Sequence, residues 1–179
     1  MLPHDFDRTE RLRVAVAGGG RCDEETHRRA LEVGRRIAEA GALLLCGGGS
    51  GVMAAAAEGA RHADGLVIGV LPGIDRHASP PNRFVDLPIY TGLGQARNLI
   101  LVLTADVVIA IGGEWGTLSE IALARKHGRP VVLLGSWRLR APESESGSEG
   151  AIEMPPAVAT AAEAVDRALV LAKRRETPE

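Results

Sequence analysis

The stretch DVVIAIGGEWGTLSE, residues 106–120, contains the pattern that decides the fold. Its first part is a nearly continuous apolar run, which predicts a strand buried on both faces of a sheet. Gly112 and Gly113 then predict a tight turn. Thr117 and Glu120 have the spacing of an S/T-x-x-E capping box, which predicts a helix over 118–127. A strand, a glycine turn and a helix in this order form the repeating unit of an α/β fold.

The same unit recurs on both sides of this stretch. Short apolar runs predict buried strands at LRVAVA (12–17), ALLLC (42–46), LVIGVL (66–71), DVVIAI (106–111) and PVVLL (130–134). Amphipathic stretches predict helices over 24–40, 52–62, 93–103, 118–127 and 161–175. Because strands and helices alternate, we expect the strands to be parallel, with helices on both faces of the sheet. The sequence therefore predicts a Rossmann-like, three-layer α/β/α fold with a parallel sheet.

Length and composition fit a single domain. The chain has 179 residues, of which 45% are hydrophobic and 25% charged, as in globular domains with a substantial core. We expect one domain over 1–179, with its core at about 12–135 and a C-terminal helix over 161–175. The acidic, serine-rich segment 142–150 is predicted to be a mobile loop. The segment PGIDRHASPPNRF (72–84) is predicted to be a surface loop near a ligand pocket, or else a simple connector.

Several classes of function are disfavoured. The net charge is −2 and the basic residues are scattered, which disfavours binding to nucleic acid. No apolar run is long enough to cross a bilayer, so we expect a cytoplasmic protein without a membrane partner. Cys22 and Cys46 stand apart and the histidines are dispersed, so no metal site is predicted. The only lysines, Lys126 and Lys173, lie far from the glycine clusters, which disfavours a pyridoxal phosphate enzyme.

Three glycine clusters, at 18–20, 47–51 and 112–117, each follow a predicted strand and precede a predicted helix. Open parallel sheets bind ligands at this edge, because glycine lets backbone N–H groups approach the ligand and the next helix offers unpaired donors to an anion. We therefore expect a phosphate or another small anion; the alternative is that the glycines only form tight turns. Neither GxxxxGK(S/T) nor a complete GxGxxG occurs, which disfavours ATP and NAD. The candidate ligand-binding residues are Gly18, Gly19, Gly47, Gly48, Gly49, Ser50, Gly51, Gly112, Gly113, Gly116 and Thr117.

Three motifs resemble those of a known family. CGGGSGVMAAAAEGA (46–60), GQARNLIL (94–101) and GGEWGTLSE (112–120) are similar to motifs of the LOG (Lonely Guy) superfamily, whose signature is PGGxGTxxE. The resemblance covers about residues 13–135 and is strongest to the LOG-like branch that includes molybdenum cofactor carrier proteins. In this chain Ile111 replaces the signature proline, and Glu114 with Trp115 lengthens the spacer between the glycines by one residue.

The resemblance implies one of two functions. LOG enzymes are phosphoribohydrolases, which release the free base and ribose 5-phosphate from a nucleoside 5′-monophosphate; the alternative is a non-catalytic molybdenum cofactor carrier. For the enzyme, the resemblance assigns catalysis to Arg97 and Glu120, and phosphate binding to the last glycine cluster. A carboxylate can stabilise the oxocarbenium-like state of glycosidic cleavage. Both functions imply a phosphorylated small-molecule ligand, a nucleotide or molybdopterin, and no further cofactor is required.

Further expectations concern individual residues and assembly. Trp115 is a candidate for stacking on a base or pterin ring, or else it covers the core. Glu114 adds a negative charge beside the expected anion site. Glu120 is expected to cap its helix without ligand and to turn toward the sugar when a phosphate takes the same amides. The resemblance implies a homodimer or larger homo-oligomer, and the apolar excess over 93–103 fits either such a contact or a fully buried helix.

Overall fold

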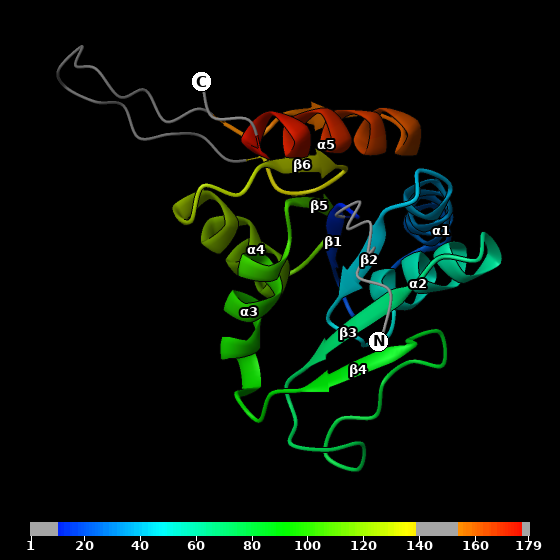
Figure 1. Ribbon diagram of the computed structural model, residues 1–179, viewed down its shortest axis with the longest axis vertical. Helices are drawn as coiled ribbons and strands as arrows, with labels where there is room; N and C mark the ends of the chain where they lie inside the picture. Colours follow the sequence, from blue (N-terminus) through cyan, green and yellow to red (C-terminus); the bar gives the residue numbers. More distant parts are fainter. Residues whose placement is uncertain (1–10, 139–153, 177–179) are drawn as a thin grey trace, which may run out of the picture.

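A computed structural model describes residues 11–138 and 154–176, and these residues form one sheet with helices on both faces (Figure 1). All neighbouring strands in this part of the chain are parallel. The sheet has seven strands in the order β4-β3-β2-β1-β5-β6-β7. The strands are β1 (Arg13–Gly18), β2 (Leu43–Cys46), β3 (Val67–Leu71), β4 (Leu87–Tyr90), β5 (Val107–Ile111), β6 (Val131–Leu134) and β7 (Ala157–Val158). The predicted α/β fold with a parallel sheet is confirmed.

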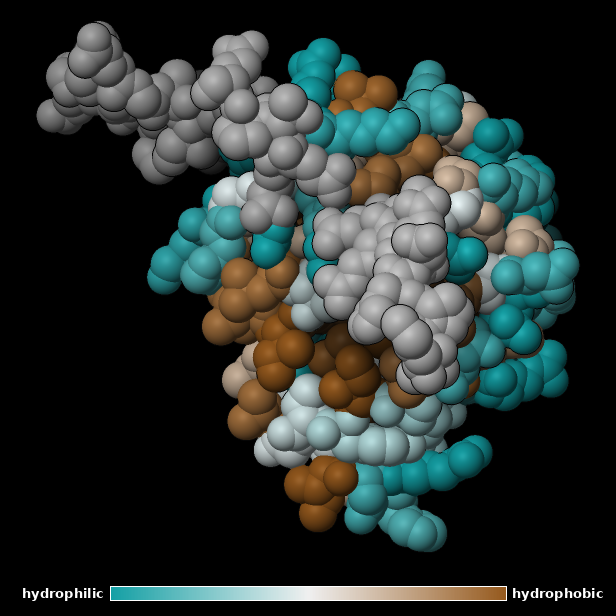
Figure 2. Space-filling model, in the orientation of Figure 1, coloured by the Kyte–Doolittle hydropathy of each residue, from teal (hydrophilic) through white to brown (hydrophobic). Residues whose placement is uncertain are grey.

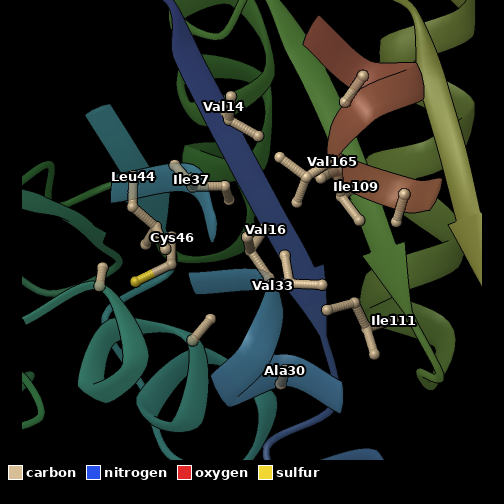
Figure 3. Packing of buried hydrophobic residues seen from close by; sticks show 14 of the residues in the cluster. Val14, Val16, Ala30, Val33, Ile37, Leu44, Cys46, Ile109, Ile111 and Val165 are labelled. Carbon is tan, nitrogen blue, oxygen red and sulfur yellow. The ribbon is translucent and has the colours of Figure 1, made fainter. Parts of the chain in front are cut away.

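Two layers of helices cover the sheet. The helices are α1 (Glu24–Glu39), α2 (Val52–His62), α3 (Arg97–Thr104), α4 (Trp115–Lys126) and α5 (Ala161–Glu176). Side chains alternate between the faces of a strand, so Val14 and Val16 of β1 pack toward α1, α2 and α5, whereas Ala15 and Ala17 pack toward α3 and α4. Figure 3 shows Val14 and Val16 of β1 with Val165 of α5 in the first of these two cores. Burial on both faces explains why the central strands are apolar throughout.

Helices α1 and α2 cross at a contact that only glycine permits. A Cβ atom on Gly34 of α1 would lie 1.8 Å from the carbonyl oxygen of Ala56 in α2. A Cβ atom on Gly59 of α2 would lie 1.8 Å from the carbonyl oxygen of Leu31 in α1. Each helix backbone therefore rests directly on the other, and a methyl group at either position would force the helices apart.

The chain order creates an opening between β1 and β5. From β1 the chain adds β2, β3 and β4 on one side, and then returns to add β5, β6 and β7 on the other. The connections at the carboxyl ends of β1 and β5 consequently diverge, which leaves a crevice for a ligand. At the opposite end of these strands, Asp106 accepts hydrogen bonds from the amide, Nε and Nη2 of Arg13 at 2.8, 3.0 and 2.7 Å. This cluster fixes the register of the two central strands.

The sequence did not predict the two edge strands. In β4, Pro88 interrupts the apolar run and Leu87 and Ile89 are partly exposed, so the stretch lacks the features of a buried strand. An edge strand tolerates proline because one side of its backbone needs no partner. At the other edge, β7 has only 2 residues, too few for a periodic pattern.

Two helix predictions need correction, and two loop predictions have different outcomes. The segment predicted as a helix over 93–103 is divided into a 3₁₀ turn, Gly94–Ala96, and α3, which begins at Arg97. Helix α4 begins at Trp115, three residues before the predicted start. Residues 72–84 do form a loop of turns and bends, whereas the predicted mobile loop 142–150 lies outside the described residues.

The described residues contain neither a membrane-spanning helix nor a cluster of metal-binding side chains. Among the described helices, none combines the length and apolar character needed to cross a bilayer. Within the same residues, no group of three or more His, Cys, Asp or Glu side chains lies close enough to hold a metal ion.

Candidate ligand-binding site at the β1–β5 crevice

A pocket of about 150 Å³ lies at the carboxyl ends of β1 and β5. Three segments form most of its wall: the turn after β1, the start of α3 and the start of α4. This is the place where the strand order reverses, as expected for ligand sites in open parallel sheets. The lining residues are Gly18, Gly19, Gly20, Met53, Gln95, Arg97, Asn98, Glu114, Gly116, Thr117 and Glu120.

The start of α4 presents backbone donors to this pocket. Gly112 and Gly113 have φ values of 54° and 113°, which L side chains rarely adopt. A Cβ atom on Gly113 would also lie 2.5 Å from the side chain of Thr117. After this turn the first α-helical bond runs from the Leu118 amide to the Glu114 carbonyl, at 3.1 Å. The amides before Leu118 have no acceptor within the helix and are available to an anion.

The predicted capping box is not formed. Glu114, not Thr117, is the N-cap residue, and its side chain makes no capping hydrogen bond. Thr117 lies inside the first turn and is buried. Glu120 lies in the second turn, where its side chain points into the protein and is only 7% exposed. The prediction that Glu120 caps the helix is therefore wrong, and its carboxyl group is instead buried inside the protein.

Arg97 and Glu120 form a buried pair of opposite charges. Arg97 is the first residue of α3 and Glu120 belongs to α4, and their Nη1 and Oε1 atoms are 3.8 Å apart. At this distance the two groups form an ion pair but no hydrogen bond. Burial raises the pKa of Glu120 from 4.5 to about 7, although the nearby positive charge of Arg97 lowers it. Glu120 can therefore gain or lose a proton near neutral pH.

Gly47 provides the space in which the Arg97 guanidinium lies. A Cβ atom on Gly47 would be 2.2 Å from Nη1 and 2.5 Å from Nη2 of Arg97. Nε and Nη1 of Arg97 are buried and donate no hydrogen bond to the described residues. The guanidinium is thus held by packing against backbone, and its charge is opposed mainly by Glu120.

Asn98 has an orientation that its neighbours determine. Its Nδ2 donates to Ser119 Oγ at 2.9 Å, and Ser119 Oγ donates its own hydrogen to the Gly116 carbonyl at 2.8 Å. Because Ser119 has only one hydrogen to donate, it must accept from the amide nitrogen of Asn98. Asn98 Oδ1 is buried and accepts no hydrogen bond from the described residues. This network links α3 to the first turn of α4.

The glycine clusters divide into pocket lining and support. Gly18 and Gly19 line the pocket, as do Gly116 and Thr117, whereas Gly112 and Gly113 form the turn behind it. The second cluster, 47–51, is not among the lining residues. Its residues instead pack closely against their neighbours. A Cβ atom would lie 3.1 Å from Leu71 if placed on Gly48, and 2.9 Å from Met53 if placed on Gly49. A Cβ atom on Gly51 would lie 2.5 Å from the Gly19 carbonyl oxygen, and Ser50 Oγ donates to the Gly20 carbonyl at 2.8 Å, so this cluster supports the turn after β1.

The loop over 72–84 supports the site from a distance. None of its residues is among the pocket-lining residues. Asn82 instead donates from its backbone amide to the Gly48 carbonyl at 2.8 Å and from Nδ2 to the Gly49 carbonyl at 2.9 Å. The loop therefore holds the second glycine turn, which in turn supports Arg97.

Sequence reasoning missed some lining residues: Gly20, Met53, Gln95, Asn98 and Glu114 were not proposed as ligand-binding residues. Gly20 belongs to the first glycine cluster, and the position of Asn98 beside Arg97 was the one available signal for it. The placement of Met53 and Gln95 depends on how α2 and the 3₁₀ turn approach the crevice, which no local pattern specifies.

Comparison with known proteins identifies the family. Residues 11–167 match the SLOG cluster4 family. The chain belongs to this family. An uncharacterized protein from Archaeoglobus fulgidus is 45% identical to this SLOG cluster4 chain over 139 residues, which cover 74% of this chain and 90% of the relative. The resemblance to LOG-like proteins read from the motifs is thereby confirmed.

Two of the solved structures similar to this SLOG cluster4 protein come from Rippkaea orientalis and Chlamydomonas reinhardtii. The molybdenum cofactor binding protein of Rippkaea orientalis is 44% identical, with a TM-score of 0.68 over 73% of this chain and 79% of that one. A molybdenum cofactor carrier protein of Chlamydomonas reinhardtii is 36% identical, with a TM-score of 0.75 over 91% of this chain and 99% of that one. The similarity therefore includes nearly the whole Chlamydomonas protein.

In this SLOG cluster4 chain the two spacer residues of the glycine motif point to different surroundings. Glu114 lines the pocket, where its charge faces the expected anion site. Trp115 is 77% exposed, so it does not cover the core. Its ring lies against that of Trp137, with centroids 5.3 Å apart and planes inclined by 38°. Trp137 follows β6 and was not singled out from the sequence.

Proposed function

We propose that the protein binds a phosphorylated small molecule in the β1–β5 crevice and acts as a non-catalytic carrier of the molybdenum cofactor. The similar proteins from Rippkaea orientalis and Chlamydomonas reinhardtii, which bind or carry that cofactor, support this function. In this proposal the cofactor is cargo, and the protein leaves it chemically unchanged.

The observation that carries the proposal is the combination of Arg97 with the open start of α4. The first-turn amides of α4 have no intrahelical acceptor, and glycines on both sides let a phosphate approach the backbone. Arg97 adds a positive charge in the same pocket. Because the pKa of Glu120 is about 7, a large share of molecules near neutral pH have a neutral Glu120 and an unopposed Arg97. These residues suit the phosphate of a phosphorylated pterin.

A second candidate, phosphoribohydrolase activity, is favoured by one specific observation. Arg97 and Glu120, to which the LOG resemblance assigns catalysis, lie together in the pocket although they belong to different helices. A carboxyl group with a pKa near 7 can either stabilise positive charge on a sugar or transfer a proton. Glu114 does not distinguish the two functions, because a carboxylate beside the phosphate site disfavours the phosphate of a nucleotide and that of a phosphorylated pterin alike.

One experiment separates the two functions. Purified protein is incubated with AMP, GMP and CMP, and free base is measured by chromatography; a parallel sample is oxidised and assayed for pterin fluorescence. A carrier releases no base and retains pterin on purification. Base release that disappears in both Glu120→Gln and Arg97→Ala, with thermal melts showing folded variants, would establish the hydrolase instead. An absence of both base release and bound pterin would refute both functions.

We also propose that the protein self-associates through α3. Leu93 and Leu103, at the two ends of the 3₁₀ turn and α3, are 52% and 42% exposed. Figure 2 shows apolar side chains gathered on the side of the molecule where α3 and α4 lie. Sedimentation of Leu103→Glu against the unchanged protein tests this contact, since a charge there would dissociate the oligomer.

The cytoplasmic location stays a prediction.

A further inference from the structure

We propose that Trp115 and Trp137 form an aromatic platform beside the pocket, on which the flat heteroaromatic ring of the ligand stacks. The inference rests on the proposed function, because it places the ring of the same phosphorylated molecule whose phosphate lies at the start of α4. It adds to the phosphate site a second contact, which binds the heteroaromatic ring of the ligand.

The exposure of Trp115 is the first observation. Its side chain is 77% exposed, although burying a tryptophan is among the most favourable contributions a side chain can make to folding. The buried residues of α4 are Thr117, Glu120, Ile121 and Ala124, and Trp115 is not among them. The ring of Trp115 therefore contributes little to the core, and its apolar face is available to another molecule.

The second observation is that Trp137 is fixed beside Trp115. The Nε1 of Trp137 donates to the Glu114 carbonyl at 3.3 Å, and its ring centroid lies 5.3 Å from that of Trp115. Next to it, Ser136 Oγ donates to the Gly112 carbonyl at 2.6 Å. The turn after β6 is thus bound to the turn after β5. Because a hydrogen bond already holds Trp137, its side chain loses little conformational freedom when a ring stacks on the pair.

The third observation is the position of the pair relative to the pocket. Glu114 and Gly116, the residues directly before and after Trp115, both line the pocket. Consecutive Cα atoms are about 3.8 Å apart, so the tryptophan backbone lies at the pocket edge. A phosphate on the first-turn amides of α4 would leave the remainder of the ligand to extend across this edge. Neither tryptophan is among the pocket-lining residues. In this proposal the phosphate occupies the pocket of about 150 Å³, and the ring extends over the pocket edge onto the tryptophans.

The experiment uses the fact that these are the only two tryptophans of the chain. Intrinsic tryptophan fluorescence therefore reports on this pair alone. The probes are ribose 5-phosphate, AMP and GMP, which all contain a phosphorylated ribose. Only AMP and GMP also carry a heteroaromatic base. GMP is included because guanine and pterin share an amino-oxo-pyrimidine ring. We expect AMP and GMP to quench the fluorescence and ribose 5-phosphate to leave it nearly unchanged, because only the nucleotides place a ring on the platform.

Affinities measured by calorimetry quantify the contribution of the ring. Stacking on one aromatic side chain strengthens binding by about 5- to 150-fold, so we expect GMP to bind at least about 5-fold more tightly than ribose 5-phosphate. Trp115→Ala is expected to remove this ratio and leave the affinity for ribose 5-phosphate unchanged, whereas Trp115→Phe retains much of it. A variant that merely unfolds the site would weaken ribose 5-phosphate equally.

The outcomes distinguish this inference from the proposed function. If ribose 5-phosphate binds but the ring adds no affinity, or if Trp115→Ala keeps the full ratio, the platform is refuted and the phosphate site stands. If none of the phosphorylated probes binds, the platform is refuted; if the purified protein also retains no pterin, the proposed function fails with it. If Trp115→Ala changes the oligomer mass in sedimentation and keeps the ratio, Trp115 contacts a second copy and the inference is overturned.

Discussion

The buried carboxyl group of Glu120 should make the stability of the protein depend on pH in a way that one substitution removes. Burial raises its pKa from 4.5 to about 7 in the folded protein. The folded state therefore binds this proton more tightly than the unfolded state. The resulting stability is fully present below about pH 4.5, decreases as the pH rises, and is lost above about pH 7. This shift corresponds to about 3 kcal/mol of unfolding free energy.

Glu120→Gln keeps the shape of the side chain and removes its ionisation. Since the pKa near 7 already includes the attraction of Arg97, the neutral side chain is the more stable form beside that guanidinium. At pH 8 we expect the variant to exceed the unchanged protein by about 3 kcal/mol, or about 6–12 °C in Tm. Near pH 4.5 the two proteins should be nearly equal. Denaturant unfolding followed by circular dichroism at several pH values, with ligand removed, measures the difference.

Glu163→Gln is a control with the opposite sign. Hydrogen bonds from the Ala159 and Thr160 amides lower the pKa of Glu163, so its contribution to stability is present at neutral pH and lost as the pH falls. The loss of stability caused by Glu163→Gln should therefore be larger at neutral and high pH than at low pH. If the difference between Glu120→Gln and the unchanged protein is the same at pH 5 and pH 8, the assignment of a raised pKa to Glu120 is wrong.

Three further substitutions test other parts of the structure. Gly47→Ala places a methyl group 2.2 Å from Arg97 Nη1, so calorimetry should show ribose 5-phosphate binding at least about 10-fold weaker while the melting curve changes little; unchanged binding would contradict the role of Gly47. Gly34→Ala forces apart two helix backbones and should cost about 3 kcal/mol in denaturant unfolding, whereas a cost under about 1 kcal/mol would show that the crossing adapts. Asp106→Ala removes three acceptor contacts with Arg13 and should cost about 2 kcal/mol; equal stability would mean that the cluster is not needed.

The central part of the fold was predictable because its physics is local. Strands such as β5 are buried on both faces, so their sequences are apolar without interruption. The edge strand β4 could not be recognised, because Pro88 and partial exposure remove that pattern. The start of α4 was misplaced because Thr117 and Glu120 satisfy a local capping rule that tertiary burial overrides.

The candidate site was predictable only in part. Arg97 and Glu120 lie on different helices, so no spacing rule brings them together; the family resemblance identified them. The glycine clusters correctly indicated the edge of the sheet at which the pocket lies. Residues of the first and third clusters line the pocket, whereas those of the second do not. The cluster at 47–51 packs behind the pocket, where Gly47 lies against the Arg97 guanidinium. This position could not be predicted, because no local pattern in the sequence shows which turn a distant arginine will contact. A ligand role for these five residues stays a prediction.

The uncapped start of α4 implies a conflict between making the protein more robust and keeping it useful. Natural helices gain about 1 kcal/mol from a serine or aspartate whose side chain bonds the first-turn amides. Glu114 occupies that position and makes no such bond. A designer who replaced it with serine would strengthen the helix by filling the donors that an anion needs. Selection for heat tolerance alone would therefore tend to close this site.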